Sequence, residues 1–162
     1  MLELFNPAGL RMLEELHGAI AFGYVAPRVL YARFVGRISS ALGDRYVQQL
    51  AQLLNEATTL AYFADASALR EHDASWRSHF ESLVRAERSK FASIVFLTPP
   101  GAAGSSTRAL AGALGDGERE AIALVGEPLE FERALCNVAP FPDRTAKDWA
   151  HVWQVHAPRW GA

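Results

Sequence analysis

Two nearly continuous apolar runs constrain the fold of this chain more than any other feature. Residues 91–98 (FASIVFLT) and residues 59–65 (TLAYFAD) are stretches in which almost every side chain is apolar. A strand has this composition when both of its faces are buried, as in a parallel sheet covered by helices. Residues 74–88 lie between the two runs and repeat apolar side chains at helical spacing, which predicts the crossover helix that parallel strands require. The pattern therefore predicts an α/β fold.

Other segments extend this alternation. β-branched and aromatic residues predict strands at 20–25, 29–39 and 121–125, and apolar spacing predicts helices at 43–57, 107–114 and 128–137. Gly36 interrupts the second of these strands, which is typical of a bulge or a strand end. Residues 99–106 are predicted to be a loop. We expect a single domain over residues 20–139, with a small mixed or parallel sheet and crossover helices.

The two ends of the chain are expected to add to this domain. Asn6 and Pro7 form a helix-start signal, and leucines then recur near helical spacing up to Gly18, a plausible stop. This pattern predicts an amphipathic N-terminal helix within residues 1–19. The tail, residues 140–162, holds Trp149, Trp153 and Trp160. We expect it to dock on its own domain or, because tryptophan is favoured at interfaces, to contact a partner or a second copy.

Composition excludes several classes of function. The 16 Lys and Arg residues against 18 Asp and Glu give a net charge of −2, which provides no basic surface for nucleic acid or for a membrane. Cys136 is the single cysteine, and the histidines lack the spacing of a zinc site, so no metal or other cofactor is predicted. The start of the chain has no apolar signal core, and no apolar run approaches the roughly 20 residues of a spanning helix. The cytoplasm is the expected compartment.

The stretch YFADASALREHDASW, residues 62–76, contains the candidate functional residues. It holds two Asp-x-Ser units, Asp65 with Ser67 and Asp73 with Ser75, and His72 lies between them. The second unit falls at the start of a predicted helix, where Asp and Ser are favoured as caps and where a phosphate would meet unpaired backbone N–H groups. A hydrolase would need a Gly-x-Ser-x-Gly elbow, which is missing. The loop PPGAAGSST, residues 99–107, lacks the Gly-Lys-Ser/Thr of a nucleotide-binding P-loop. No enzyme is predicted.

This stretch, together with the order of the elements, resembles the STAS fold of anti-sigma-factor antagonists over residues 29–135. In that family an Asp-Ser-Ser-Gly motif begins the corresponding helix, and its second serine accepts phosphate. Asp73, Ala74, Ser75 and Trp76 match the four positions in turn, so Ala74 lacks one hydroxyl and Trp76 places a large ring where the family has glycine. The run YFADAS, followed by aromatic residues, is also similar to the looser branch that groups STAS and Sec14-like lipid-binding domains.

The resemblance implies a bacterial regulatory module that binds another protein, such as an anti-sigma factor, a kinase-like protein or a subunit of a regulatory complex. It implies phosphorylation at Ser75. The expected partner surface is made of Asp65, Ser67, His72, Asp73, Ser75, Trp76, Ser106 and Thr107.

Two alternatives remain open at this point. The first is a domain that binds a small molecule or lipid in a pocket beneath Phe63, Trp76 and Phe80. The second is an assembly protein whose tryptophan-rich tail builds an oligomer.

Overall fold

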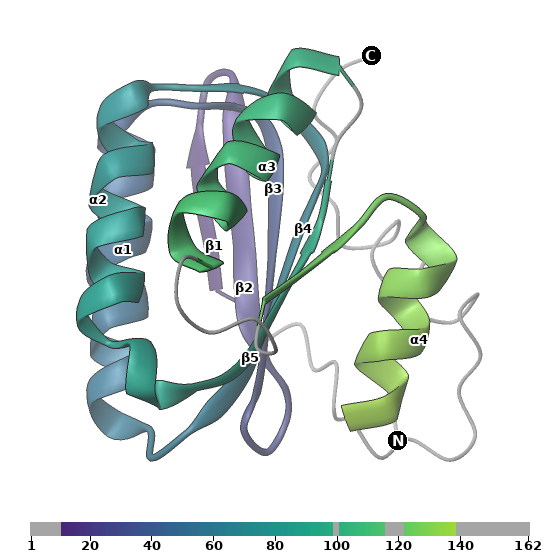
Figure 1. Ribbon diagram of the computed structural model, residues 1–162. Coiled ribbons are helices and arrows are strands. Elements are labelled where there is room, and N and C mark those ends of the chain that lie inside the picture. The colour runs from purple at the N-terminus through teal and green to yellow at the C-terminus, as the bar shows by residue number, and fades with distance from the viewer. Residues whose placement is uncertain (1–10, 99–100, 116–121, 139–162) are drawn as a thin grey trace.

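The computed structural model describes residues 11–98, 101–115 and 122–138. These residues form a mixed sheet with helices on both faces (Figure 1), which confirms the predicted α/β class. The strands are β1 (Arg11–Glu15), β2 (Gly18–Ala26), β3 (Val29–Ile38), β4 (Leu60–His72), β5 (Phe91–Leu97) and β6 (Ile122–Val125). The helices are α1 (Ser40–Glu56), α2 (Ala74–Ala86), α3 (Gly101–Gly115) and α4 (Pro128–Val138), with a short 3-10 turn, η3 (Arg88–Lys90), before β5.

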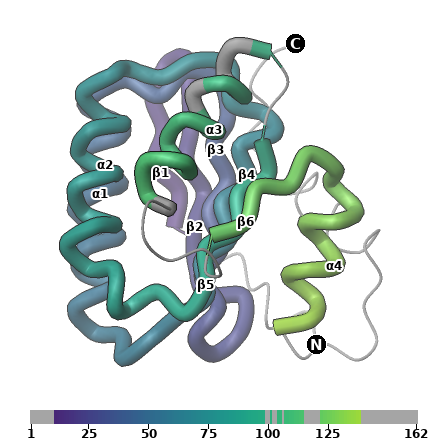
Figure 2. Tube along the Cα trace, viewed as in Figure 1, coloured from purple at the N-terminus to yellow at the C-terminus, as the bar shows by residue number. Residues whose placement is uncertain are grey.

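The strands lie in the sheet in the same order as in the chain. β1, β2 and β3 form an antiparallel meander, and β3 to β6 are parallel. Each parallel step is made through one of the helices α1, α2 and α3, as expected for crossover connections. Figure 2 shows the resulting path, from β1 at one edge of the sheet to β6 at the other, beside α4.

The sheet separates two apolar cores. Helices α1, α2 and α3 pack against one face and α4 against the other (Figure 1). Consecutive residues of β4 point in opposite directions. Tyr62 lies 6.2 Å from Phe80 of α2, and Phe63 lies 5.7 Å from Phe131 of α4, both measured between ring centroids. Burial of both faces explains why residues 59–65 are almost continuously apolar.

The predicted helix within residues 1–19 is wrong over residues 11–19, which form β1, a turn at residues 16–17 and the start of β2. β1 and β2 form a hairpin in which Leu13 is opposite Ile20, and both side chains are buried. Leu16 would share a helical face with Leu13, but it is 82% exposed, beyond the end of β1. Gly18 is not a helix stop; it allows a close approach of strands, since a Cβ there would lie 1.9 Å from the carbonyl oxygen of Arg37. Strand pairing overrides the local helical spacing. Residues 1–10 and the tail, 140–162, are outside the described residues.

β4 is longer than predicted. It continues to His72, whereas the apolar run predicted a strand that ends at Asp65. The register with β3 moves from Arg33 opposite Asp65 to Val35 opposite Ala68, which places one extra residue in β4. Such a bulge disturbs the alternation by which a strand is recognised in a sequence.

The remaining elements agree with the predictions within a few residues, apart from α3. This helix begins at Gly101, where φ is +75°, so the predicted loop over 99–106 is wrong from residue 101 onward. Gly36 has a φ of +72° and lies at a register shift between β3 and β4, which confirms the irregularity predicted there.

Candidate functional site

β3 and β4 end side by side, and each is followed directly by a helix. Ile38 is paired with His72, and the backbone N–H of Asp73 donates to the carbonyl oxygen of Ile38 at 3.0 Å. Because α1 begins at Ser40 and α2 at Ala74, the N-termini of these two helices are neighbours. The second Asp-x-Ser unit lies at this junction, at the carboxyl edge of the sheet, where open α/β proteins commonly bind ligands and partners.

A hydrogen-bond network links the two helix N-termini. One carboxylate oxygen of Asp73, Oδ2, accepts bonds from the backbone N–H of Ser40 at 2.8 Å and from the Ser40 hydroxyl at 3.0 Å. The Ser40 and Ser75 hydroxyl oxygens are 2.6 Å apart. Asp73 occupies the N-cap position of α2, as predicted, but its side chain makes no capping bond in that helix. It satisfies an N–H group of the neighbouring helix α1 instead, which ties the two helices together.

Arg37 completes this network from β3. Its guanidinium lies 3.4 Å from Oδ1 of Asp73 and 3.4 Å from a carboxylate oxygen of Glu71. The backbone N–H of Ser40 and then its hydroxyl lower the pKa of Asp73 below its ordinary value of 3.8, burial opposes them with a smaller effect, and Arg37 lowers the pKa further. Each of these groups stabilises the charged form of the carboxyl, so Asp73 is a carboxylate at neutral pH.

Ser75 and Trp76 are adjacent in the chain but lie in opposite environments. Ser75 is exposed in the first turn of α2, whereas Trp76 is only 5% exposed. The indole packs against Phe34 and Phe80, with ring centroids 5.5 Å and 6.0 Å away, and against Gly43 of α1. The large ring at the glycine position of the family motif is therefore a core residue. Trp76, which the sequence places in the partner surface, is buried, so its ring offers little surface to a partner.

His72 does not complete a catalytic triad. Its Nδ1 lies 3.3 Å from the carbonyl oxygen of Asp73, and its ring contacts the edge of Trp76 at 5.3 Å between centroids. The hydroxyl of Ser75 pairs with Ser40, and that of Ser67 pairs with Asp65. The hydroxyls of both serines thus bond to groups other than this histidine.

The first Asp-x-Ser unit lies in a different part of the protein. Asp65 is 8% exposed and belongs to the sheet face covered by α4. Its carboxylate accepts bonds from the Tyr31 hydroxyl at 2.8 Å and from the Ser67 N–H at 2.9 Å, and Arg33 lies 3.8 Å away. Burial, followed by the charge of Asp65, raises the pKa of Tyr31 well above its usual range. Asp65 therefore stabilises the β4 bulge, and the structure does not bring it together with Ser75.

Comparison with solved structures identifies the fold. An uncharacterised protein of the DUF3478 family from Shewanella loihica PV-4, described as having a SpoIIAA-like fold, matches with a TM-score of 0.56 and 18% sequence identity. The match covers 78% of this chain and all of that protein. The fold is SpoIIAA-like. This result confirms the STAS-type fold expected from the motif. No protein-family model matches the sequence. A search of curated proteins found no relative either.

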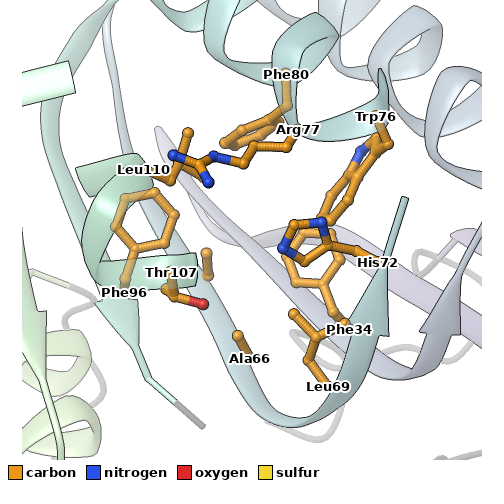
Figure 3. A pocket seen from close by; sticks show the side chains of 11 residues that line it. Phe34, Ala66, Leu69, His72, Trp76, Arg77, Phe80, Phe96, Thr107 and Leu110 are labelled. Atoms are coloured by element: carbon orange, nitrogen blue, oxygen red, sulfur yellow. The ribbon is translucent and has the colours of Figure 1, made fainter. Parts of the chain in front are cut away.

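The SpoIIAA-like core contains a cleft between α2, α3 and β4 (Figure 3). Eleven residues line it: Phe34, Ala64, Ala66, Leu69, His72, Trp76, Arg77, Phe80, Phe96, Thr107 and Leu110. Its volume is about 30 Å³, which is enough for about one water molecule. A typical ligand site has a volume of roughly 300 Å³ or more. Phe63 lies on the opposite face of the sheet, so the predicted pocket beneath Phe63, Trp76 and Phe80 together is wrong.

Two of the predicted partner residues, Ser106 and Thr107, belong to α3, which borders this cleft. Thr107 lines the cleft and is 6% exposed, so like Asp65 and Trp76 it offers little surface to a partner. The side chain of Ser106 lies outside the described residues. Ser67, His72 and Asp73 are partly exposed, and Ser75 is fully at the surface.

Sequence reasoning missed Arg37, near the end of β3, and Ser40 and Gly43, in the first turn of α1. A Ser-Ser pair before a helical pattern, at residues 39 and 40, is an N-cap signal that locates the start of α1. The Ser39 side chain does cap this helix, by accepting a bond from the N–H of Leu42 at 3.1 Å. The closeness of Ser40 to Ser75 can be inferred only once β3 and β4 are known to be parallel neighbours.

In residues 11–98, 101–115 and 122–138, no group of three or more His, Cys, Asp or Glu side chains could hold a metal ion. Among the helices that the structure describes, none has the length and apolar composition to cross a membrane.

Proposed function

We propose that this chain is a regulatory protein-interaction module without catalytic activity of its own, and that phosphorylation of Ser75 controls its binding to a protein partner. One observation carries the proposal. In this protein, which has a SpoIIAA-like fold, Ser75 at the start of α2 is exposed, and its hydroxyl belongs to a hydrogen-bond network with Ser40 and Asp73. The compartment proposed for this module is the cytoplasm, where ATP is available to a protein kinase.

A phosphate at Ser75 would change this surface strongly. It adds a charge of about −1.5 to −2, close to the Asp73 carboxylate. The N-terminal end of α2 favours such a charge, whereas Asp73 repels it. The phosphate would also compete with Asp73 for the Ser40 hydroxyl, which lies 2.6 Å from the Ser75 oxygen. Both effects would alter the charge and shape that a partner meets at this edge of the sheet.

The partner surface proposed here is narrower than the one predicted from sequence. It consists of the exposed or half-exposed side chains around the start of α2, which are Glu71, His72, Asp73, Ser75 and Arg77. The partner is a protein of the kinds that the family resemblance implies, an anti-sigma factor, a kinase-like protein or a regulatory subunit.

The test uses a matched pair of serines on the same helix. The unmodified full chain is used to capture its partner from source cells, and the partner is then purified. Affinity is measured for Ser75→Ala, Ser75→Asp, Ser78→Ala and Ser78→Asp. The proposal requires that the two substitutions at Ser75 differ in affinity by about tenfold or more, which corresponds to about 1.4 kcal/mol. Ser78 is also exposed and lies one turn further along, so its two variants should bind equally. Equal affinity of Ser75→Ala and Ser75→Asp for the partner would reject the switch.

A further inference from the structure

The direction of each hydrogen bond in the Ser75 network follows from counting donors. A carboxylate has no proton to donate, so Asp73 accepts from the Ser40 hydroxyl in their 3.0 Å contact. A serine hydroxyl carries one proton, and that of Ser40 is used in this charge-assisted bond. In the 2.6 Å contact between the two serines, Ser75 is therefore the donor and Ser40 the acceptor. The chain of donation runs from Ser75 to Ser40 to Asp73.

This direction affects how Ser75 reacts. Its proton points toward Ser40, in the space between the helices, and its oxygen lone pairs are left for solvent or for an incoming reactant. Asp73 is held in place for its part in the chain. Its Oδ2 is bonded to both the N–H and the hydroxyl of Ser40, and its Oδ1 is paired with Arg37. Neither Ser40 nor Arg37 is part of the motif shared with the family.

We infer that Ser40 and Asp73 are positioning residues that prepare the Ser75 hydroxyl to accept a phosphoryl group. This inference rests on the proposed function. The phosphoryl donor is a nucleoside triphosphate bound to a protein kinase. The Ser75 oxygen forms a bond to the γ-phosphorus, and the bond from that phosphorus to the β,γ-bridging oxygen breaks, so that the nucleoside diphosphate leaves with the electron pair. The Ser75 proton moves to Ser40, as the Ser40 proton moves to Asp73.

One substitution removes only the proton relay, which is the path from the Ser75 hydroxyl through the Ser40 hydroxyl to Asp73. Ser40→Ala deletes the hydroxyl, while its backbone N–H still bonds to Asp73 at the first position of α1. Ser40→Thr retains a hydroxyl that can accept from Ser75 and donate to Asp73. Ser67→Ala is the matched control, because it removes a serine hydroxyl that is bonded to Asp65 in the other Asp-x-Ser unit.

The experiment measures phosphorylation of the full chain by extract of source cells with ATP labelled at the γ-position, and mass spectrometry maps the site. Proton transfer by a positioned group typically contributes about 10²-fold or more to a rate. We expect Ser40→Ala to lower the maximal rate of labelling at Ser75 by about that factor without raising KM, and Ser40→Thr to restore most of it. Ser67→Ala should be labelled like the unmodified chain. Thermal unfolding of each variant shows whether it remains folded.

The outcomes separate the inference from the proposed function. If the unmodified chain is labelled at Ser75 and Ser40→Ala is labelled equally fast, the relay is refuted and the switch stands. The relay is also refuted if Ser40→Ala raises only KM, or if Ser40→Thr is as slow as Ser40→Ala. If the unmodified chain gains no label at Ser75, both the proposed phosphorylation at this site and the relay are refuted.

Discussion

The contact between Gly43 and Trp76 predicts a strong and unusual effect of a small substitution. Gly43 lies in α1, and a Cβ added there would be 2.1 Å from Cδ1 and 2.2 Å from Cγ of the Trp76 ring. Carbon atoms in contact are normally about 3.5–4.0 Å apart, so the ring or the helix must move by about 1.5 Å. Gly43→Ala should therefore destabilise the protein, although alanine is favoured over glycine in a helix by about 1 kcal/mol.

The magnitude follows from this conflict. Overpacking a core costs about 1–3 kcal/mol, and we expect about 2–3 kcal/mol here because the ring is enclosed by Phe34 and Phe80. Subtracting about 1 kcal/mol for the helix preference of alanine leaves a net loss of about 1–2 kcal/mol. For a chain of this length that is a fall in Tm of about 2–8 °C. Urea unfolding followed by far-UV circular dichroism measures the free energy of unfolding, and it does not depend on the fluorescence of the tryptophan that is changed.

A double-mutant cycle and a control make the reasoning refutable. Trp76→Ala alone should cost about 3–5 kcal/mol, as for other buried aromatic residues. In that background the obstacle is gone, so Gly43→Ala should become neutral or stabilising by up to about 1 kcal/mol. Gly112→Ala in α3 is the matched control, since nothing lies within 4 Å of a Cβ there, and it should stabilise the chain. If Gly43→Ala is tolerated in the presence of Trp76, the packing argument is wrong.

Two further predictions concern the buried and half-buried carboxylates. The pKa of Asp73 is lowered in the folded state, so the contribution of this carboxylate to stability is complete above its ordinary pKa of 3.8 and is lost as the pH falls through the folded pKa. Asp73→Asn should therefore reduce the loss of stability at acid pH, measured as the free energy of unfolding from pH 6 downward. An unchanged acid dependence would contradict the network. Tyr31→Phe removes a donor to the buried Asp65 carboxylate and should cost about 1–3 kcal/mol in urea unfolding. Tyr24→Phe is its control, because Tyr24 is 41% exposed, and equal effects of the two substitutions would show that the bond to Asp65 adds nothing.

The parts of the fold that the sequence predicted are those in which local pattern and tertiary burial agree. The apolar runs that became β4 and β5 are buried on both faces, and the helices α1 and α2 each keep one apolar face toward the sheet. The hairpin of β1 and β2 was missed because Leu13 and Leu16 fit a helical spacing, and only pairing with Ile20 buries the first while leaving the second exposed. The second half of β4 was missed because its bulge removes the alternation, and its partner in the sheet, the end of β3, is distant in the chain.

The candidate site was predictable in its residues but not in its contacts. Asp73 and Ser75 were identified from one helix start, yet their hydrogen-bond partner is Ser40, 33 and 35 positions away in the sequence. That contact depends on the register of two parallel strands, which no short motif encodes. The same long-range geometry turned Asp65 toward α4 and so separated two Asp-x-Ser units that look equivalent in the sequence.

The position of Trp76 determines what a charge at Ser75 can do. Because the ring of Trp76 is packed against Gly43 of α1, the first turn of α2 is held to α1 by apolar contact as well as by the Asp73–Ser40–Ser75 hydrogen bonds. A phosphate at Ser75 could break those hydrogen bonds, but moving the indole of Trp76 into water would lose the burial of a large apolar ring. We therefore expect the packing at this helix junction to persist, and the proposed phosphate to act on the exposed surface, through its charge and through the release of Asp73 and Arg37 from their present partners. Trp76→Gly would remove this anchor, so we expect the start of α2 in that variant to shift more readily when a charge is placed at position 75.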